Sequence, residues 1–362
     1  MRVLLFSDHH AHAFKPYSNV LSSGINSRLW DSVQVLNQIA KLVKKHKVDV
    51  VLFGGDLFHV RGTLNVQTFN LVFDAIAHMR MYAQVGLLVG NHDQTNRTGD
   101  VHSVYSLGSV VRVMDKPTWN AFQVDAVTLQ VFSFPYHSDK DLLLQAVEQA
   151  VQSHPKGFHP AILLGHFGIT GAKVGGNFVL VDNHNLEVAD LRFSEFDQVF
   201  LGHYHEPQQL VVNVRYLGAT HHHNWGDVGS ERGCWLWDTQ ENQKYSEPTL
   251  IPLDAPRFVF VEHGVPVERD DVVNNYVRVQ FQGELDTAVR LRAEEDLYGL
   301  GARVVEFVDL DPTKATVNVG SFHPGMDINE MISSYAYEYG SEILDTDYLI
   351  SIGQALMNGD SL

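Results

Sequence analysis

The sequence predicts an α/β protein in which helices cover the outer faces of sheets, followed by a small βαβ unit. In the first half, short and continuously apolar runs alternate with stretches that repeat apolar residues at three- and four-residue steps. These patterns are typical of buried strands and of amphipathic helices. Residues 276–308 read as strand, helix and strand. With 362 residues, 44% of them apolar, the chain can bury a sizeable core and form more than one domain.

The N-terminal half gives the clearest succession of elements. We expect strands at residues 2–6, 48–53, 85–89, 127–134, 161–164 and 199–201, and helices at 28–45, 66–82 and 139–152. The first helix is predicted from apolar residues that share one face, namely Leu29, Val33, Leu36, Ile39 and Val43.

The C-terminal half is predicted to contain more strands and a domain boundary. Residues 215–218 and 234–237 look like paired strands, and the proline-bounded stretch 252–256 marks a boundary. We therefore expect domains at 1–255 and 256–325 and a helical segment at 326–362. The second helical pattern of that segment carries an apolar stripe at Leu344, Tyr348, Ile352 and Leu356.

The composition limits the kind of protein and its location. The single cysteine, Cys234, excludes a disulfide framework, and the apolar run at 2–6 is too short for a signal peptide or a membrane span. We expect a soluble cytoplasmic protein with no membrane partner, or one in the host cytoplasm if a phage encodes it. The net charge of −17 argues against DNA as a partner. However, residues 327–362 hold seven acidic and no basic residues, so part of this charge sits at one end.

Candidate metal ligands follow five of the predicted strands. They are Asp8 and His10, Asp56, Asn91, His166, and His203 with His205, and His92 directly follows Asn91. Because ligands of α/β sheets bind beyond the carboxyl ends of strands, these side chains should converge. A glycine adjoins four of the five positions and would let the backbone approach closely where side chains crowd.

A phosphodiester explains why such residues would be brought together. The anionic phosphate repels hydroxide, and two divalent cations about 3.5–4 Å apart can clamp it and acidify a water. Two ions need roughly seven protein ligands, with one carboxylate shared. Imidazoles and carboxylates without thiolate suit manganese best, with magnesium, iron or zinc as alternatives. Any one of these motifs alone would usually be structural, but five in a fixed order at strand ends would not.

The order Asp-x-His, Gly-Asp, Gly-Asn-His-Asp, Gly-His and Gly-His-x-His resembles the signature of calcineurin-like metallophosphoesterases, over roughly residues 1–240. The resemblance implies a four-layer sandwich of two facing mixed sheets flanked by helices. One ion would be held by Asp8, His10, Asp56 and His205, and the other by Asp56, Asn91, His166 and His203, with Asp56 bridging. His92 would contact the scissile phosphate and help to protonate the leaving oxygen.

Residues 55–59, 216–220, 233–238 and 252–258 are in addition similar to the SbcD-type nucleases. This similarity implies that His59 supports exonuclease action and that the βαβ unit is a capping domain that positions DNA. It also implies a coiled-coil ATPase partner of the SbcC type and a homodimer. The stripe at Leu344–Leu356 is a candidate ATPase docking surface, and Phe69, Val72, Phe73 and Ile76 a candidate dimer face, although both could pack within their own domain. The chain departs from the family at 218–220 and in a longer loop at 11–26.

The expected activity is therefore that of a two-metal DNA nuclease in recombination and repair, acting as an exonuclease on duplex ends and an endonuclease on single strands or hairpins. Cations in loops near the motifs are candidate phosphate contacts, namely Lys15, Arg61, Arg97 and Lys173. We expect the histidines at 221–223 to form a loop at the rim of the site. The alternative is a phosphoesterase for cyclic nucleotides, other small phosphodiesters or phosphoproteins, which would share every metal ligand. A non-enzymatic scaffold would be expected to lose some ligands, and none is lost.

Overall fold

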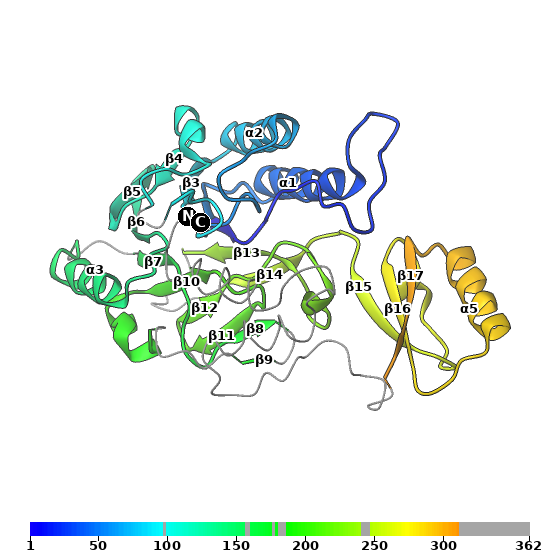
Figure 1. Ribbon diagram of the computed structural model, residues 1–362. Helices are drawn as coiled ribbons and strands as arrows, with labels where there is room; N and C mark the ends of the chain where they lie inside the picture. Colours follow the sequence, from blue (N-terminus) through cyan, green and yellow to red (C-terminus); the bar gives the residue numbers. More distant parts are fainter. Residues whose placement is uncertain (97–98, 156–159, 176–177, 180–185, 240–246, 311–362) are drawn as a thin grey trace, which may run out of the picture. The chain divides into compact units, whose positions relative to one another are not determined.

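The computed structural model describes residues 1–96, 99–155, 160–175, 178–179, 186–239 and 247–310. Two six-stranded sheets form its centre (Figure 1). The first has the order β14-β13-β1-β2-β3-β4. Its strands are β1 (Arg2–Phe6), β2 (Val50–Phe53), β3 (Gln84–Leu88), β4 (Arg112–Met114), β13 (Gly233–Asp238) and β14 (Thr249–Pro252). The four strands from β1 to β4 run parallel, and β13 and β14 extend the sheet antiparallel on one side.

The second sheet is also mixed and has the order β11-β12-β10-β7-β6-β5. Its strands are β5 (Thr118–Val124), β6 (Val127–Phe134), β7 (Ala161–His166), β10 (Gln198–Gly202), β11 (Gln208–Val211) and β12 (Val214–Tyr216). The four inner strands run parallel, whereas β5 and β11 pair antiparallel at the two edges.

Alternate residues of the strands enter two different cores, as the period of two along a strand requires. Leu4 and Phe6 of β1 pack with helices α1 (Ser27–Lys45) and α2 (Val66–Arg80) on the outer face. Val3 and Leu5 instead pack against the second sheet, in a core that includes Phe200. A third core lies between the second sheet and α3 (Lys140–Gln152). The predicted fold, two facing mixed sheets flanked by helices, is confirmed.

The helices begin where the sequence offers a polar side chain for the free backbone N–H groups. Asn26 accepts from the N–H groups of Arg28 and Leu29 at the start of α1. Asn65 and Asp139 cap α2 and α3 in the same way. Short elements complete this region: β8 (Lys173–Gly175), β9 (Phe178–Val179), and the 3₁₀ turns η1 (Tyr105–Ser109), η2 (Val188–Leu191), η3 (Phe193–Glu195) and η4 (Trp225–Asp227).

The predicted pairing of 215–218 with 234–237 is wrong. The first run forms β12, which lies beside β10 in the second sheet, whereas the second run forms β13, which pairs with β1 in the first sheet. Both runs are strands, but apolarity does not specify the partner, and the chain crosses between the sheets after β12. The stretch at 252–256, read only as a boundary, starts with the last residue of β14.

A three-stranded sheet follows, made of β15 (Phe258–Glu262), β16 (Tyr276–Phe281) and β17 (Val304–Asp309) in that order, with α4 (Arg269–Val272) and α5 (Thr287–Leu300). Strands β16 and β17 run in the same direction, because the carbonyls of Asn275 and Phe281 accept from the N–H groups of Arg303 and Leu310. The predicted strand–helix–strand unit is therefore present.

The chain divides into two compact units. Among the described residues, one comprises 1–259, 268–277 and 298–304, and the other comprises 260–267, 278–297 and 305–310. The docking stripe predicted at Leu344–Leu356 lies outside the described residues. Among the residues that are described, no helix combines the length and the apolar character needed to cross a membrane.

Candidate metal centre

The seven predicted ligands lie at the ends of strands from both sheets. Asp8, Asp56 and Asn91 follow β1, β2 and β3, while His166 ends β7 and His203 and His205 follow β10. The parallel strands of each sheet carry these ends to one edge. Asp8, His10, Asp56, Asn91 and His166 are buried, and His203 and His205 are partly buried.

Short distances connect five of the seven side chains. His10 Nε2 lies 3.2 Å from His205 Nε2 and 3.6 Å from Asp56 Oδ2. Asp56 Oδ2 lies 3.4 Å from His166 Nε2. The ligand atoms of Asp8, His10 and His205 lie within 4.8 Å of one another, as do those of Asp8, Asp56 and His166. The structure therefore gathers two neighbouring groups of metal-ligand atoms that share Asp8.

The side-chain amide of Asn91 tests whether these residues fit a cation. Its Oδ1 lies 3.0 Å from both His166 Nε2 and His203 Nδ1, beside Asp56 Oδ2. Turned over, the amide would donate to these three atoms and accept from Arg61 Nη2 at 2.8 Å. That orientation suits a chain without metal, whereas a cation selects the inward oxygen because amide oxygen is a ligand and amide NH₂ is not. Two carboxylates, four imidazoles and one amide oxygen thus fit two divalent ions.

The backbone is strained at four of the seven positions. Asp8 and His10 both have φ of 50°, Asp56 has 62° and His203 has 97°. Such conformations cost about 1–3 kcal/mol each for residues other than glycine and concentrate at functional sites. The surrounding fold therefore holds these side chains in place at an energetic cost.

Glycines allow the close approach of the strand ends. A Cβ atom on Gly90 would lie 2.2 Å from Asp56 Oδ1, and one on Gly202 would lie 2.4 Å from the Gly54 carbonyl oxygen. No side chain fits at these distances. The glycines at these strand ends therefore allow the backbone to approach closely where side chains crowd, as the sequence suggested.

Asp56 and His166 form a buried pair with opposite charges. Burial disfavours the charged form of each group, but the His166 imidazole outweighs it and lowers the pKa of Asp56 to about 2. Burial is likewise overcome by Asp56 and Asp8, which raise the pKa of His166 to about 9. A divalent cation would supply the same positive charge and release the proton from His166, as metal binding to imidazole requires.

The calcineurin-like phosphoesterase family matches residues 1–207, more than half of the chain. The chain belongs to this family. A curated relative, the SbcD component of the nuclease SbcCD from Staphylococcus epidermidis, is 22% identical over 269 residues, which cover 70% of this chain and 71% of the relative.

Two solved structures are also similar to this phosphoesterase. A putative 5′-nucleotidase from Staphylococcus aureus is 15% identical with a TM-score of 0.42, and the match covers 75% of this chain and 56% of the nucleotidase. A dimetal phosphatase from Danio rerio is 11% identical with a TM-score of 0.39, and the match covers 60% of this chain and 86% of the phosphatase. This chain thus spans little more than half of the nucleotidase.

Two carboxylates that support the centre of this phosphoesterase were not predicted as functional. Asp227 Oδ1 lies 3.2 Å from His205 Nδ1, so it can orient this imidazole with Nε2 toward the other ligands. Asp93 accepts from the backbone N–H groups of Asp56, Leu57 and Gly90 at 2.9–3.0 Å and so fixes the loop that carries Asp56. Asp93 stands in the Gly-Asn-His-Asp motif, which could have indicated it. Asp227 could not have been found in the sequence, because it lies 22 residues after His205 and belongs to no motif.

Residues 221–223 form a loop at the site, as predicted, but this loop is buried and does not lie at an exposed rim. All three histidines are buried, and the His223 ring lies 5.0 Å from that of His205 and 5.1 Å from that of His10. His223 Nε2 is 3.0 Å from the Asp8 carbonyl oxygen, which holds the strained backbone there. The three imidazoles bond to groups of the same protein, and His223 forms an inner wall of the site.

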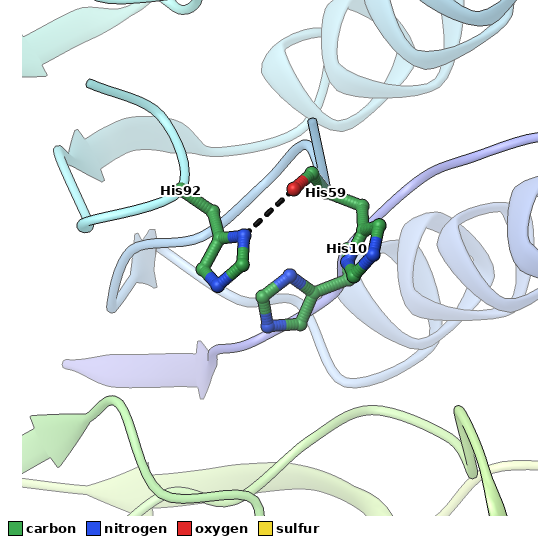
Figure 2. Close-up of side chains that lie close together, drawn as sticks. All are labelled: His10, His59 and His92. Atoms are coloured by element: carbon green, nitrogen blue, oxygen red, sulfur yellow. Dashed lines mark hydrogen bonds between the residues drawn. The ribbon is translucent and has the colours of Figure 1, made fainter. Parts of the chain in front are cut away.

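His92 and His59 lie together beside the predicted ligand His10 (Figure 2). His92 Nδ1 lies 2.7 Å from the His59 carbonyl oxygen, so Nδ1 carries the proton and donates it. The two rings stack at 5.4 Å, and the ring of His10 lies 4.7 Å from that of His92. Burial and the neighbouring His92 lower the pKa of His59 to about 4, so His59 is neutral near neutral pH.

The four predicted phosphate-binding cations occupy different surroundings. Arg61 is exposed, and its guanidinium lies beside the Asn91 amide. Lys15 and Lys173 are exposed in the loop after β1 and in β8. Arg97 lies outside the described residues.

Proposed function

We propose that this phosphoesterase is a two-metal DNA nuclease and the nuclease component of an end-processing complex with a coiled-coil ATPase. The observation that carries the proposal is the His92–His59 pair beside seven convergent metal ligands. The similarity to the SbcD component of an SbcCD nuclease supports DNA as the substrate, and it extends over 269 residues, more than the 207 of the family match. The reaction would be exonucleolytic on duplex ends and endonucleolytic on single strands or hairpins, in recombination and repair.

The residues divide the work of hydrolysis among them. Asp8, His10, Asp56 and His205 would hold one ion, and Asp56, Asn91, His166 and His203 the other, with manganese as the first candidate. When bound, two such ions neutralise the phosphate and acidify a water. The hydrogen bond from His92 Nδ1 to the His59 carbonyl leaves Nε2 to contact the scissile phosphate. As an imidazolium, His92 would pass the Nε2 proton to the leaving oxygen and regain a proton from the water consumed in hydrolysis.

The charge of the whole chain is compatible with this proposal. Carboxylates that hold cations are neutralised locally, and the ions make the site attractive to phosphate. The DNA phosphate backbone would in addition be contacted by Lys15, Arg61, Arg97 and Lys173. The ATPase would dock through the segment after residue 326, and α2 would pair two copies of the chain.

The test is cleavage of end-labelled duplex DNA with Mn²⁺. His92→Ala should lower the rate about 10²-fold or more, the usual contribution of a positioned acid. Asp56→Ala should remove both metal binding and activity, because Asp56 Oδ2 lies within 3.6 Å of His10 in one group of ligands and within 3.4 Å of His166 in the other. His59→Ala should impair degradation from duplex ends.

The matched control is His78→Ala, which removes an exposed imidazole of α2 and should leave cleavage unchanged. A panel of cyclic nucleotides, small phosphodiesters and phosphopeptides completes the experiment. Hydrolysis of any of these by a protein that leaves DNA intact would replace the nuclease assignment with the alternative phosphoesterase.

A further inference from the structure

A pocket of about 380 Å³ opens beside the metal ligands. Histidines of the centre and of its inner wall line this pocket, namely His10, His59, His92, His205 and His223. Further lining residues come mainly from the long loop at 11–26 and the start of α1, and they include Phe14, Tyr17 and Arg28. The volume lies near the lower end of the range for small-molecule sites, so the pocket suits one nucleotide rather than a base pair.

The aromatic residues of the pocket contact neighbouring side chains. The Phe14 ring lies 4.8 Å from the ring of His59. The hydroxyl of Tyr17 accepts from Trp225 Nε1 at 3.1 Å, and its ring packs on the buried Phe258 at 5.8 Å. Planar side chains fixed in this way can receive a flat ring with little loss of conformational entropy.

Arg28 contributes a positive charge to the lining of this pocket. Its guanidinium donates to the carbonyl oxygens of Pro16 and His223 and lies 4.5 Å from the Phe14 ring centre. It forms no salt bridge with any carboxylate of the described residues. A partly buried cation beside a phosphoesterase centre favours an anionic ligand, and guanidinium planes also stack on bases.

We propose that this pocket is a nucleotide subsite, in which Phe14 and Tyr17 contact the base next to the scissile phosphate and Arg28 faces the sugar-phosphate backbone. The inference rests on the proposed hydrolysis of nucleic-acid phosphodiesters. Stacking on aromatic rings tolerates every base, so the subsite would position a strand without selecting a sequence. The long loop at 11–26, a departure from the family pattern, would thereby act in substrate binding.

The test is binding to the Mn²⁺-loaded protein, measured by calorimetry with deoxyadenosine 5′-monophosphate, deoxyribose 5-phosphate and inorganic phosphate. The wild type should bind the nucleotide about tenfold or more tightly than the base-free sugar phosphate, as expected for one stacked base. Phe14→Leu should remove this preference, and Phe14→Tyr, which retains the ring, should keep it. Equal affinities of the wild type for the first two ligands would overturn the subsite, whether or not the variants fold.

Cleavage assays separate this inference from the proposed function. Oligonucleotides with an abasic residue next to the scissile bond should be cut about tenfold less efficiently than intact ones. Tyr17→Leu should reduce this difference in cleavage efficiency. A protein that prefers the nucleotide in the binding assay but cuts no DNA would refute the nuclease and retain the subsite. A protein that cuts intact and abasic strands equally and binds both small ligands equally would refute the subsite and retain the nuclease.

Discussion

At the scale of single residues, the contact between Asp227 and His205 decides how well one metal site is formed. The carboxylate lies 3.2 Å from His205 Nδ1 and also accepts from the backbone N–H of His223 at 2.8 Å. Asp227→Asn keeps the shape but removes the charge that raises the basicity of the imidazole. Because such supporting groups are typically worth 10–100-fold in metal affinity, we expect a loss of about that size in a Mn²⁺ titration.

The matched control is Asp125→Asn, the same change at an exposed turn between β5 and β6, where the positive φ of 53° tolerates asparagine. It should leave the Mn²⁺ isotherm unchanged. Superimposable isotherms for Asp227→Asn and the wild type would show that His205 is oriented without the carboxylate.

The sequence identified side chains that end strands but not those that support them from loops. Asp8, Asp56, Asn91, His166 and His203 could be named because each follows an apolar run. Asp227 and His223 could not, since their roles depend on contacts with Asp8 and His205 that form only when both sheets are in place. The left-handed backbone at Asp8 and His10 was likewise invisible, because it is imposed by neighbours rather than by residue type.

At the scale of elements, continuous apolar runs predicted the inner strands, and the edge strands were missed. Strand β6 has the predicted bounds, whereas β5 was overlooked because most of its residues are exposed or half-buried. The wrong pairing of β12 with β13 has a related cause. A short apolar run shows that a strand is buried, but its partner is chosen by packing between segments far apart in the chain.

Gly90, in the turn between β3 and Asn91, lies too close to Asp56 to carry a side chain. A methyl group at Gly90 would lie 2.2 Å from Asp56 Oδ1 and 2.4 Å from Asp56 N. Gly90→Ala should therefore displace Asp56, lower the free energy of unfolding by about 1–3 kcal/mol and weaken metal binding. Urea unfolding and a Mn²⁺ titration measure the two effects.

The same substitution at Gly299, in the last turn of α5, is the control for Gly90→Ala. Nothing lies within 4 Å of a Cβ atom there. Alanine is the better helix former, so Gly299→Ala should raise the free energy of unfolding by up to about 1 kcal/mol. A Gly90→Ala protein as stable and as metal-competent as the wild type would contradict the crowding at the strand ends.

At the scale of the whole molecule, the centre joins the two sheets. Asp8, Asp56 and Asn91 come from the first sheet, and His166 and His203 come from the second. Ions bound between them should stabilise the folded chain by about 2.7 kcal/mol at a concentration 100 times the dissociation constant. We expect a chelator to lower the melting temperature of the wild type and to leave that of Asp56→Ala unchanged. An equal shift in both proteins would place the stabilising ion elsewhere.

Buried neutral histidines set the acid limit of the metal-free protein. His9 is fully buried between Thr220 and Ser32, and burial lowers its pKa to about 3. The unfolded chain takes up a proton near pH 6.5 that the folded chain refuses, so His9 costs stability as the pH falls from about 6.5 toward 3.

Each pH unit in this window should remove about 1.4 kcal/mol from the free energy of unfolding through His9 alone. Burial also lowers the pKa of His221, which therefore adds to the loss of stability at acidic pH. Asp56 raises the pKa of His166 to about 9, so His166 instead makes the chain less stable as the pH rises above 6.5. The free energy of unfolding can be measured by urea unfolding with chelator between pH 6 and 4. Its dependence on pH should correspond to about one proton fewer in His9→Gln than in the wild type. The exposed His78→Gln serves as control, and equal slopes for His9→Gln and the wild type would mean that His9 is protonated in the folded chain.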